Sequence, residues 1–331
     1  MKWVLGIESS CDETAAALWH VPTRRFFEVI ARQLATHAPY GGVVPELASR
    51  CHLETVAPLV QAVCRQAGIT LGEIDAVAAT AGPGLAGALI VGLSYGKALA
   101  AALGKPFVAV NHIEAHMVSA CAEQEVPFPF VALVVSGGHT LLADVEEVCR
   151  YRIIGRTRDD AAGEAFDKGA KLLGLGYPGG LALARLAERG NPRAIHFPRA
   201  LMRRGVFDFS FSGLKTALLY YLEEHPDRAQ EDVAASYQEA IVDVLARKTI
   251  AAARMLARRY VVLGGGVSAN AALRTRLQAD AKRYGLYVVL PSLPLCTDNA
   301  RMIAYRGATL LEARGADALT ADIFPTFRVT C

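Results

Sequence analysis

The sequence predicts an α/β fold made of two mixed-sheet lobes that arose by duplication, and three observations indicate it. The chain has 331 residues, which is too long for one simple core and natural for two domains of about 150 residues. Short apolar runs alternate with segments of helical periodicity. The order of these elements then occurs twice, on either side of a proline-containing joint at 123–129.

In the first half, three strands come first, and helices and strands then alternate. Phe26 to Leu34 is the third strand, and the glycines and proline at 82–84 end a later one. The expected strands are 3–8, 15–20, 26–34, 74–80 and 107–110, and the expected helices are 45–66, 85–103 and one opening at His112.

The second half repeats this order with a longer insertion. The expected strands are 130–135, 140–145, 151–155, 260–263 and 286–290, and the expected helices are 163–173, 231–256, 270–283 and one from about 297. Residues 175–227 form an irregular, partly helical insertion. We therefore expect an N-terminal lobe at 1–125 and a C-terminal lobe at 126–331, with the last helix packing back on the N-terminal lobe.

Composition excludes several classes of protein. A formal charge of +3 is nearly neutral, so the arginine groups at 150–158 and 254–259 are either solvated faces or local patches for an anion. Seven cysteines, with no Cys-x-x-Cys pair, argue against a disulfide framework or a structural zinc cluster. A reducing cytoplasm fits best. Residues 76–96 carry no charge, but their glycines and a proline favour a strand, a turn and a buried helix over a membrane span.

Two histidines predict a metal site. His112 and His116 are four residues apart at the start of a helix, so their imidazoles lie on one face and can reach one ion. Glu114 stands two places after His112, unlike the adjacent glutamate of a zinc-protease helix. Asn111-His112 at the end of the first half corresponds to Asp298-Asn299 at the end of the second. We therefore expect Asp298 to face the histidines across the crevice between the copies, as the third ligand of a zinc or ferrous ion.

Glycine turns in the second half are suited to a nucleotide. Val134, Val135, Ser136, Gly137 and Gly138 form a strand that ends in a turn whose N–H groups could hold a phosphate, although for this element by itself an ordinary hairpin turn is the simpler interpretation. The turn at 264–270, which ends in Asn270, is followed by a helix and suits an adenosine or phosphate.

An acidic segment opens the helix near residue 163. Asp160, Glu164 and Asp167 would share one face there, where like charges repel. This indicates either a functional cluster or a helix start neutralised by Lys168 and Lys171.

Together these motifs carry a family resemblance. The runs at 6–14 and 41–46, the histidine pair, 135–140, 159–168, 209–215, 265–270 and 296–299 resemble, in order and spacing, the universal tRNA threonylcarbamoyladenosine family in its bacterial form, TsaD. The resemblance covers residues 3 to about 307. It implies the actin-like, sugar-kinase-like duplicated (ASKHA) fold, with the active site in the cleft between the lobes.

The resemblance also implies roles for particular residues. His112, His116 and Asp298 match metal ligands, with Fe²⁺ favoured and Zn²⁺ as the alternative. The positions that hold the threonylcarbamoyl-adenylate substrate are matched by Val134, Val135, Ser136, Gly137, Gly138, Asp167, Gly180 and Asn270. Asp167 is expected on the ribose.

The implied reaction moves the threonylcarbamoyl group to the exocyclic amine of the adenosine 3′ of the anticodon, in tRNAs that read codons starting with A, and releases AMP. That amine is a weak nucleophile, so the carbonyl must be activated, and we expect the metal to do this as a Lewis acid. Asp12 is a candidate general base, although a plain turn carboxylate is the simpler interpretation. The implied partners are a TsaB-like paralogue and a TsaE-like ATPase, with contact through the helices after Pro45.

Other classes stay open on the sequence alone. A metalloprotease could use the paired histidines, although the adjacent glutamate is missing. A non-catalytic nucleotide-binding scaffold could keep the loops. A sugar kinase shares the architecture, but magnesium prefers oxygen ligands to two imidazoles.

Overall fold

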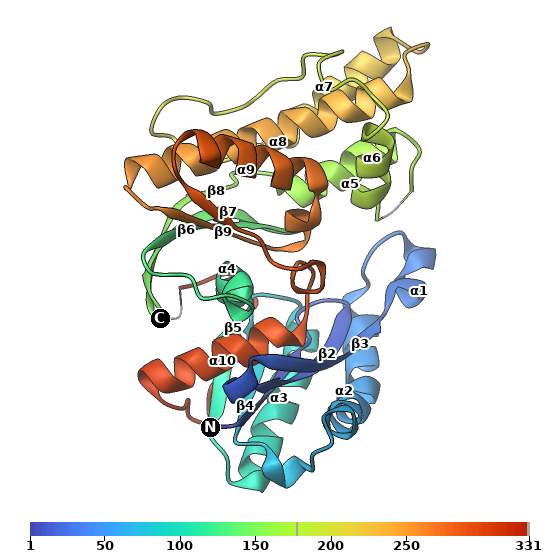
Figure 1. The fold of residues 1–331 in the computed structure, drawn as a ribbon. Coiled ribbons are helices and arrows are strands. Elements are labelled where there is room, and N and C mark those ends of the chain that lie inside the picture. Colours follow the sequence, from blue (N-terminus) through green and yellow to red (C-terminus); the bar gives the residue numbers. More distant parts are fainter. Residues whose placement is uncertain (177, 330–331) are drawn as a thin grey trace. The chain divides into compact units, whose positions relative to one another are not determined.

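The computed structural model describes residues 1–176 and 178–329 (Figure 1). The chain divides into two compact units, one formed by Met1–Glu125 with Thr297–Cys331 and the other by Val126–Cys296. The C-terminal segment thus belongs to the first unit. Each unit contains a five-stranded mixed sheet with the same topology, in the orders β3-β2-β1-β4-β5 and β8-β7-β6-β9-β10. In both sheets the first three strands are antiparallel, and the later two join in parallel.

In the first unit, Pro45 occupies the first turn of α2, and Gly68, at φ +70°, ends that helix, as proline and glycine commonly do. The elements of this unit are β1 (Trp3–Glu8), β2 (Glu13–His20), β3 (Arg25–Arg32), α1 (Leu34–His37), α2 (Pro45–Ala67), β4 (Ala76–Gly82), α3 (Ala86–Leu103), β5 (Phe107–Asn111), α4 (His112–Val118) and α10 (Ala300–Arg314), with short 3₁₀ turns at Val21–Thr23, Ala38–Tyr40, Leu71–Glu73 and Ser119–Ala122.

In the second unit, the insertion expected at 175–227 contains two helices, α6 and α7. The elements are β6 (Phe130–Val135), β7 (Thr140–Glu147), β8 (Arg150–Arg156), α5 (Ala162–Leu172), α6 (Gly180–Ala187), α7 (Ser212–Glu224), α8 (Gln230–Met255), β9 (Tyr260–Gly264), α9 (Ala271–Arg283) and β10 (Tyr287–Val289), with 3₁₀ turns at Gly266–Ala269 and Leu293–Leu295. All the expected strands and helices are present. The short α1 is an addition, and α10 begins three residues later than expected, because Asn299 caps it.

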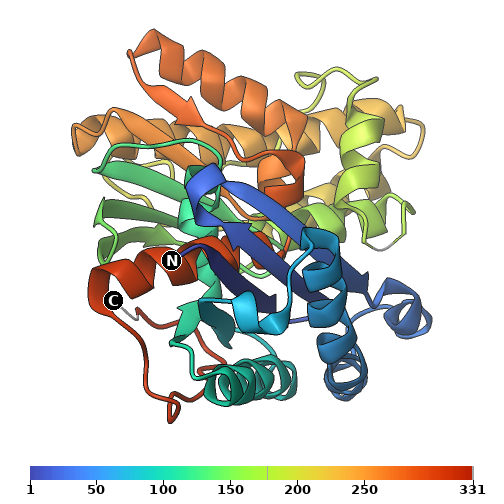
Figure 2. The same cartoon turned by 60° about the horizontal axis from the view of Figure 1, so that its bottom comes forward.

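Strand alternation places helices on both faces of the first sheet. Leu5 and Ile7 of β1 pack in the core with α2 and α3, which lie side by side (Figure 2). Val4, on the opposite face, packs against Ala304 and Ala308 of α10. A Cβ atom on Gly6 would come within 2.4 Å of the carbonyl oxygen of Ala300, so glycine is what lets α10 approach β1.

The uncharged stretch at 76–96 forms β4 and most of α3, as the sequence predicts. Among the described helices, α3 alone is long and apolar enough to cross a membrane by length and composition. Its buried side includes Leu89 and Leu93 and packs against α2 and β4. The described cysteines, which exclude only Cys331, are all free.

Candidate functional site

The first candidate site is built around a buried carboxylate at the end of β1. Glu8 follows Val4 and Gly6 on the face of the strand that α10 covers, because alternate residues share a face. Its side chain is completely buried. It accepts hydrogen bonds from the backbone N–H of Ser10 (2.6 Å) and from the hydroxyl of Thr80 (2.7 Å). Glu8 is therefore held in one orientation.

The two histidines stand at the end of β5, a strand that runs parallel to β4, as β4 does to β1. Asn111 caps α4 by accepting hydrogen bonds from the N–H groups of Ile113 and Glu114. His112 and His116 then follow on one face of the helix, with ring centroids 4.7 Å apart. Both side chains are buried.

Asp298 completes the group from the segment just before α10. Asn299 caps that helix by accepting from the N–H of Met302, as Asn111 does for α4. Asp298 Oδ1 lies 3.1 Å from Nε2 of His116 and 3.4 Å from Nε2 of His112. The ligand atoms of all three residues lie within 4.8 Å of one another.

The internal symmetry of the sequence assigns Asp298 to the second lobe, opposite the histidines. In the structure, all three residues belong to the first unit. The reason is the packing of α10 against β1, β2 and β4, which brings the residue that precedes the helix to the edge where β1 and β5 end.

These charges are strongly coupled. Burial lowers the pKa of His112, but the carboxylates of Glu8 and Asp298 outweigh it and raise that pKa well above its usual value. Burial raises the pKa of Asp298, but the two histidines bring it well below its usual range. For His116, burial dominates and lowers the pKa. In the metal-free protein His112 therefore carries the positive charge between two carboxylates.

The residues present fit a divalent metal ion. Two ligands bound at about 2.05 Å to a tetrahedral ion lie about 3.3 Å apart, close to the separations of 3.1 and 3.4 Å between Asp298 and the two histidines. Because Glu8 Oε2 lies 3.0 Å from Nδ1 of His112, that nitrogen carries the proton and Nε2 is left as the donor to a metal. About a quarter of the Asp298 side chain is exposed, so the site is open to solvent on that side.

Three nearby acids have different roles. Glu114 is buried and pairs with Arg306 at 2.7 Å, so it is turned to an ion pair and not to the histidines. Asp12, the candidate base, is partly buried in the turn after β1, where its carbonyl accepts from the N–H of Gln33. Glu13 is the acid with an unusual environment, because burial, Asp298 and Asp12 raise its pKa to about 8.

Sequence reasoning missed Glu8, Ser10 and Thr80 as parts of this site. The available signal was Glu8 itself, a carboxylate that ends an otherwise apolar strand. Nothing local to residue 8 reveals that its partner is His112, because that contact depends on the pairing of β1 with β4 and of β4 with β5.

In the second unit, the glycine turns lie beside each other at the ends of parallel strands. Val134 of β6 pairs with Gly264 of β9. Gly265 has φ +85°, and a Cβ atom there would lie 2.4 Å from the carbonyl oxygen of Val135. A Cβ atom on Gly137, Gly138 or Gly266 would meet no atom of the described residues within 4 Å. The two turns thus pack tightly against each other at Gly265 and Val135, and the space beside Gly137, Gly138 and Gly266 is empty of described residues.

The start of α5 closes the Ser136 turn. The N–H of Gly163 donates to the carbonyl of Ser136, and a Cβ atom on Gly163 would lie 2.4 Å from that oxygen. Ser136 is also fixed internally, since its hydroxyl accepts from the N–H of His139. Val134 and Val135 are fully buried, so their side chains serve the core of the sheet.

Of the remaining sequence-predicted residues, Asp167 lies within α5, Gly180 begins α6 and Asn270 precedes α9. Asp167 Oδ1 accepts from the N–H groups of Gly179 and Gly180, both at 2.9 Å, so the first turn of α6 is tied to α5. Asn270 caps α9 and donates to Gln238 at 2.8 Å. The structure therefore gives both residues a local structural partner.

For the acidic face of α5, the structure favours the simpler interpretation. Lys168 pairs with Asp160 at 2.7 Å and with Glu164 at 2.9 Å, which neutralises both acids. The adjacent Asp159 accepts from the hydroxyls of Ser210 and Ser212 and so fixes the start of α7.

Comparison with protein families gives one match that spans most of the chain. The model of a family described as TsaD, tRNA N6-adenosine threonylcarbamoyltransferase, matches residues 25–305. A protein of that name from Syntrophotalea carbinolica is 51% identical over 324 residues, which cover 97% of this chain and 94% of the relative. A protein of the same name from Ralstonia pickettii is 53% identical, covering 94% of this chain and 92% of the relative.

Solved structures support the fold. Full-length HypF in its phosphate- and nucleotide-bound form matches with a TM-score of 0.64 at 13% identity, covering 96% of this chain and 56% of that one. Component A of the (R)-2-hydroxyglutaryl-CoA dehydratase of Acidaminococcus fermentans matches with a TM-score of 0.53 at 16% identity, covering 97% and 98% of the two chains. These neighbours agree with the actin-like α/β fold that the sequence predicts.

Proposed function

Because this chain belongs to the TsaD family of tRNA N6-adenosine threonylcarbamoyltransferases, we propose that His112, His116 and Asp298 hold one divalent metal ion that serves the transfer. The protein is an acyltransferase that modifies tRNA. The observation that carries the proposal is the convergence of two imidazoles and one carboxylate within 4.8 Å, in a single unit. Fe²⁺ is the favoured occupant and Zn²⁺ the alternative, since this donor set suits both.

The donor is threonylcarbamoyl-adenylate, and the acceptor is the exocyclic amine of the adenosine 3′ of the anticodon in tRNAs that read codons starting with A. A divalent ion in this site would supply Lewis-acid polarisation of the threonylcarbamoyl carbonyl. Glu8 fixes the tautomer and direction of His112, because it accepts from Nδ1. Asp298 supplies the anionic ligand on the side that is open to solvent.

In the second unit, the turns at Ser136 to Gly138 and at Gly265 to Asn270 hold the adenylate. Two features support this role: the space beside the α-carbons of Gly137, Gly138 and Gly266 is open, and each turn lies next to a helix start, where an anion is favoured. Asp167 and Gly180 belong to the same proposed adenylate site, with Asp167 on the ribose, and Asp167 also ties the first turn of α6 to α5. Asp12 remains our proposed general base, as it lies in the same turn segment as Ser10 and Glu13.

The alternatives from the sequence are disfavoured. A zinc-protease helix supplies its base from a glutamate next to the first histidine, and the glutamate of α4, Glu114, is paired with Arg306. The family match is to a transferase, which also counts against a scaffold without activity.

We also propose the cytoplasm as the location, where the tRNA substrate is made and used. A TsaB-like paralogue would dock on α2 and α3, with a TsaE-like ATPase as a further partner. The support is an apolar surface on this helix pair, where Leu53 is 70% and Ile90 51% exposed.

The test is His112→Ala, with His196→Ala as a matched control, because His196 is exposed in the second unit. Metal content is measured on anaerobically purified protein, and transfer is measured on purified tRNA with threonylcarbamoyl-adenylate. We expect His112→Ala to lose bound metal and transfer while keeping its fold, and His196→Ala to keep all three. Full turnover by His112→Ala would refute the metal's role.

A further inference from the structure

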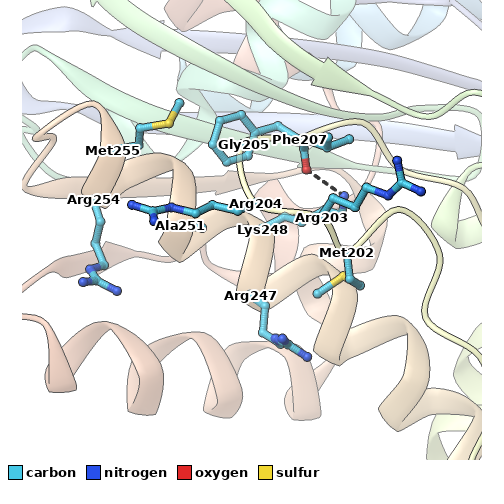
Figure 3. A pocket seen from close by; sticks show the side chains of 11 residues that line it. Met202, Arg203, Arg204, Gly205, Phe207, Arg247, Lys248, Ala251, Arg254 and Met255 are labelled. Carbon is cyan, nitrogen blue, oxygen red and sulfur yellow. Dashed lines mark hydrogen bonds between the residues drawn. The ribbon is translucent and has the colours of Figure 1, made fainter.

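A positively charged pocket in the second unit is not used by the reaction described above. It has a volume of about 530 Å³ and lies between the loop at 202–207 and the last turns of α8 (Figure 3). Five cationic side chains line it, namely Arg203, Arg204, Arg247, Lys248 and Arg254, and no acidic residue does. The whole chain carries a formal charge of only +3, so positive charge is concentrated here.

Lys248 builds the pocket and is not free to bind a ligand. Its side chain is buried, and its Nζ donates to the carbonyls of Leu201 (2.7 Å), Val206 (2.9 Å, the dashed line in Figure 3) and Asp208 (2.7 Å). An ammonium group has three donors, so all are used. The 201–208 loop is thereby held in one shape over α8 before any ligand arrives.

The arginines around this pocket stay available. Arg203 and Arg204 are exposed on the loop, and within the described residues no carboxylate lies at ion-pair distance from either of them or from Arg254. The guanidinium of Arg254 lies 4.0 Å from the ring centroid of Tyr284, and such stacking leaves the N–H edges free. Arg247 shares its one acid, Asp243 at 3.4 Å, with Arg276 at 2.7 Å.

The other arginine group of the sequence shows what a neutralised surface looks like. On β8, Arg150 pairs with Glu146 and Glu147, and Arg152 with Asp144. Arg158, just after that strand, pairs with Asp208. Of the second arginine group of the sequence, at 254–259, Arg254 lines the pocket, whereas Arg258 pairs with Asp144 at 2.8 Å. In the part of the chain that the structure describes, Arg150, Arg152 and Arg158 thus have acidic partners, whereas Arg203, Arg204 and Arg254 have none at ion-pair distance.

We propose that this pocket binds backbone phosphates of the tRNA substrate. Guanidinium groups donate two parallel hydrogen bonds to a phosphate, and two loop arginines with two helix arginines can hold successive phosphates. Arg247 and Arg254 lie on one face of α8, seven residues apart. Met202, Phe207 and Met255 give the pocket apolar walls against which a ribose or base can pack. The inference relies on tRNA being the acceptor of the transfer.

The experiment measures tRNA binding without turnover, so that it is independent of the metal centre. The triple variant Arg203→Gln, Arg204→Gln, Arg254→Gln is titrated with an unmodified transcript of a tRNA that reads an ANN codon, at several salt concentrations. Each lost phosphate contact lowers the slope of log K against log salt by about 0.7–0.9, and weakens binding about 5-fold near 0.15 M salt. We expect the Kd to rise roughly 100-fold and the slope to fall by about 2–3 units.

Arg193→Gln is the matched control. Arg193 is exposed, and it follows Asn191, whose N–H donates to Asp232 near the start of α8. Arg247 comes 15 residues after Asp232, about 22 Å along the helix. Metal content and thermal stability of each variant are measured alongside, so that loss of fold or of the metal centre is recognised separately.

Three outcomes would overturn the inference: an unchanged Kd and salt slope in the triple variant, an equal loss in Arg193→Gln, or a loss of AMP binding with tRNA binding retained. The last outcome would mean that the pocket serves a free nucleotide. A selective loss of tRNA affinity, with AMP binding and metal content intact, supports it.

Discussion

The two units carry candidate sites of opposite construction. In the first unit, side chains build the site: His112 and His116 are buried with Glu8 and Asp298, and the group is suited to a cation. In the second unit, glycine turns build it from backbone, with the open side at Gly137, Gly138 and Gly266. A side-chain site should fail when a functional group is removed, whereas a backbone site should fail when an atom is added. The predictions below test that difference.

The largest effect is expected for Asp298→Ala. This change removes the only carboxylate among the three proposed ligands and leaves His112 and His116 without the acid that lies 3.4 and 3.1 Å from them. Loss of the metal would remove several kcal/mol of transition-state stabilisation, so we expect transfer to fall by roughly 10³-fold. Single-turnover transfer and metal analysis measure it.

The control for this change is Asp322→Asn, an exposed aspartate in the same C-terminal segment, which should leave metal content and rate unchanged. If Asp298→Ala kept stoichiometric metal, the ligand set would have to be revised.

Glu8→Gln should have the next largest effect. The amide keeps the size of the side chain, but it loses the negative charge that Nδ1 of His112 meets at 3.0 Å. Loss of such an outer partner typically weakens metal affinity about 10–100-fold. Competition with a chelator measures the affinity, and excess metal should restore transfer in Glu8→Gln but not in Asp298→Ala. If transfer stayed equally low in both variants at saturating metal, Glu8 would have a direct role in the transfer reaction.

Much of this could be predicted from the sequence, for identifiable reasons. The strands and helices follow from local periodicity, and the histidine pair follows from helical spacing. The role of Glu8 could not be predicted, because its contact with His112 depends on the pairing of β1 with β4 and of β4 with β5. Arg254 could not be distinguished in sequence from the arginines of β8, and the ion pairs made after folding distinguish them. Local pattern thus gives elements and ligand types, while tertiary packing decides which charges remain unpaired.

Gly163→Ala tests the backbone site by adding one methyl group. The new Cβ atom would lie 2.4 Å from the carbonyl oxygen of Ser136, so the turn must move. Such overpacking destabilises by about 1–3 kcal/mol, and we expect the KM for the adenylate to rise roughly tenfold. Steady-state kinetics with varied adenylate measure it, and metal content should not change.

Gly213→Ala is the matched control, because Gly213 is the second residue of α7 as Gly163 is of α5. A Cβ atom there would meet no described atom within 4 Å, so the change should be neutral or stabilise the protein by about 0.4–1 kcal/mol. Equal kinetics of the two variants would contradict a role for the Ser136 turn in holding the adenylate.

The smallest effect concerns the charge balance of the first site. Burial, Asp298 and Asp12 raise the pKa of Glu13 from 4.5 to about 8. The folded, metal-free protein therefore binds a proton at Glu13 that the unfolded chain has already released between these two values. In that window the free energy of unfolding must fall as the pH rises, because the folded state holds more protons there.

Glu13→Gln removes the titrating group and therefore this pH-dependent fall in the free energy of unfolding. We expect its Tm to differ little from wild type near pH 5 and to exceed it by a few degrees at pH 8, measured in the presence of a chelator. The comparison with wild type cancels the contribution of His112, whose pKa is also raised and whose stabilisation is likewise lost with rising pH. A divalent ion beside Asp298 offsets the repulsion, so adding metal should shrink the difference at pH 8. If the Tm difference at pH 8 persisted at saturating metal, the cation would not lie close enough to Asp298 and Glu13 to offset their repulsion, which would contradict Asp298 as a ligand.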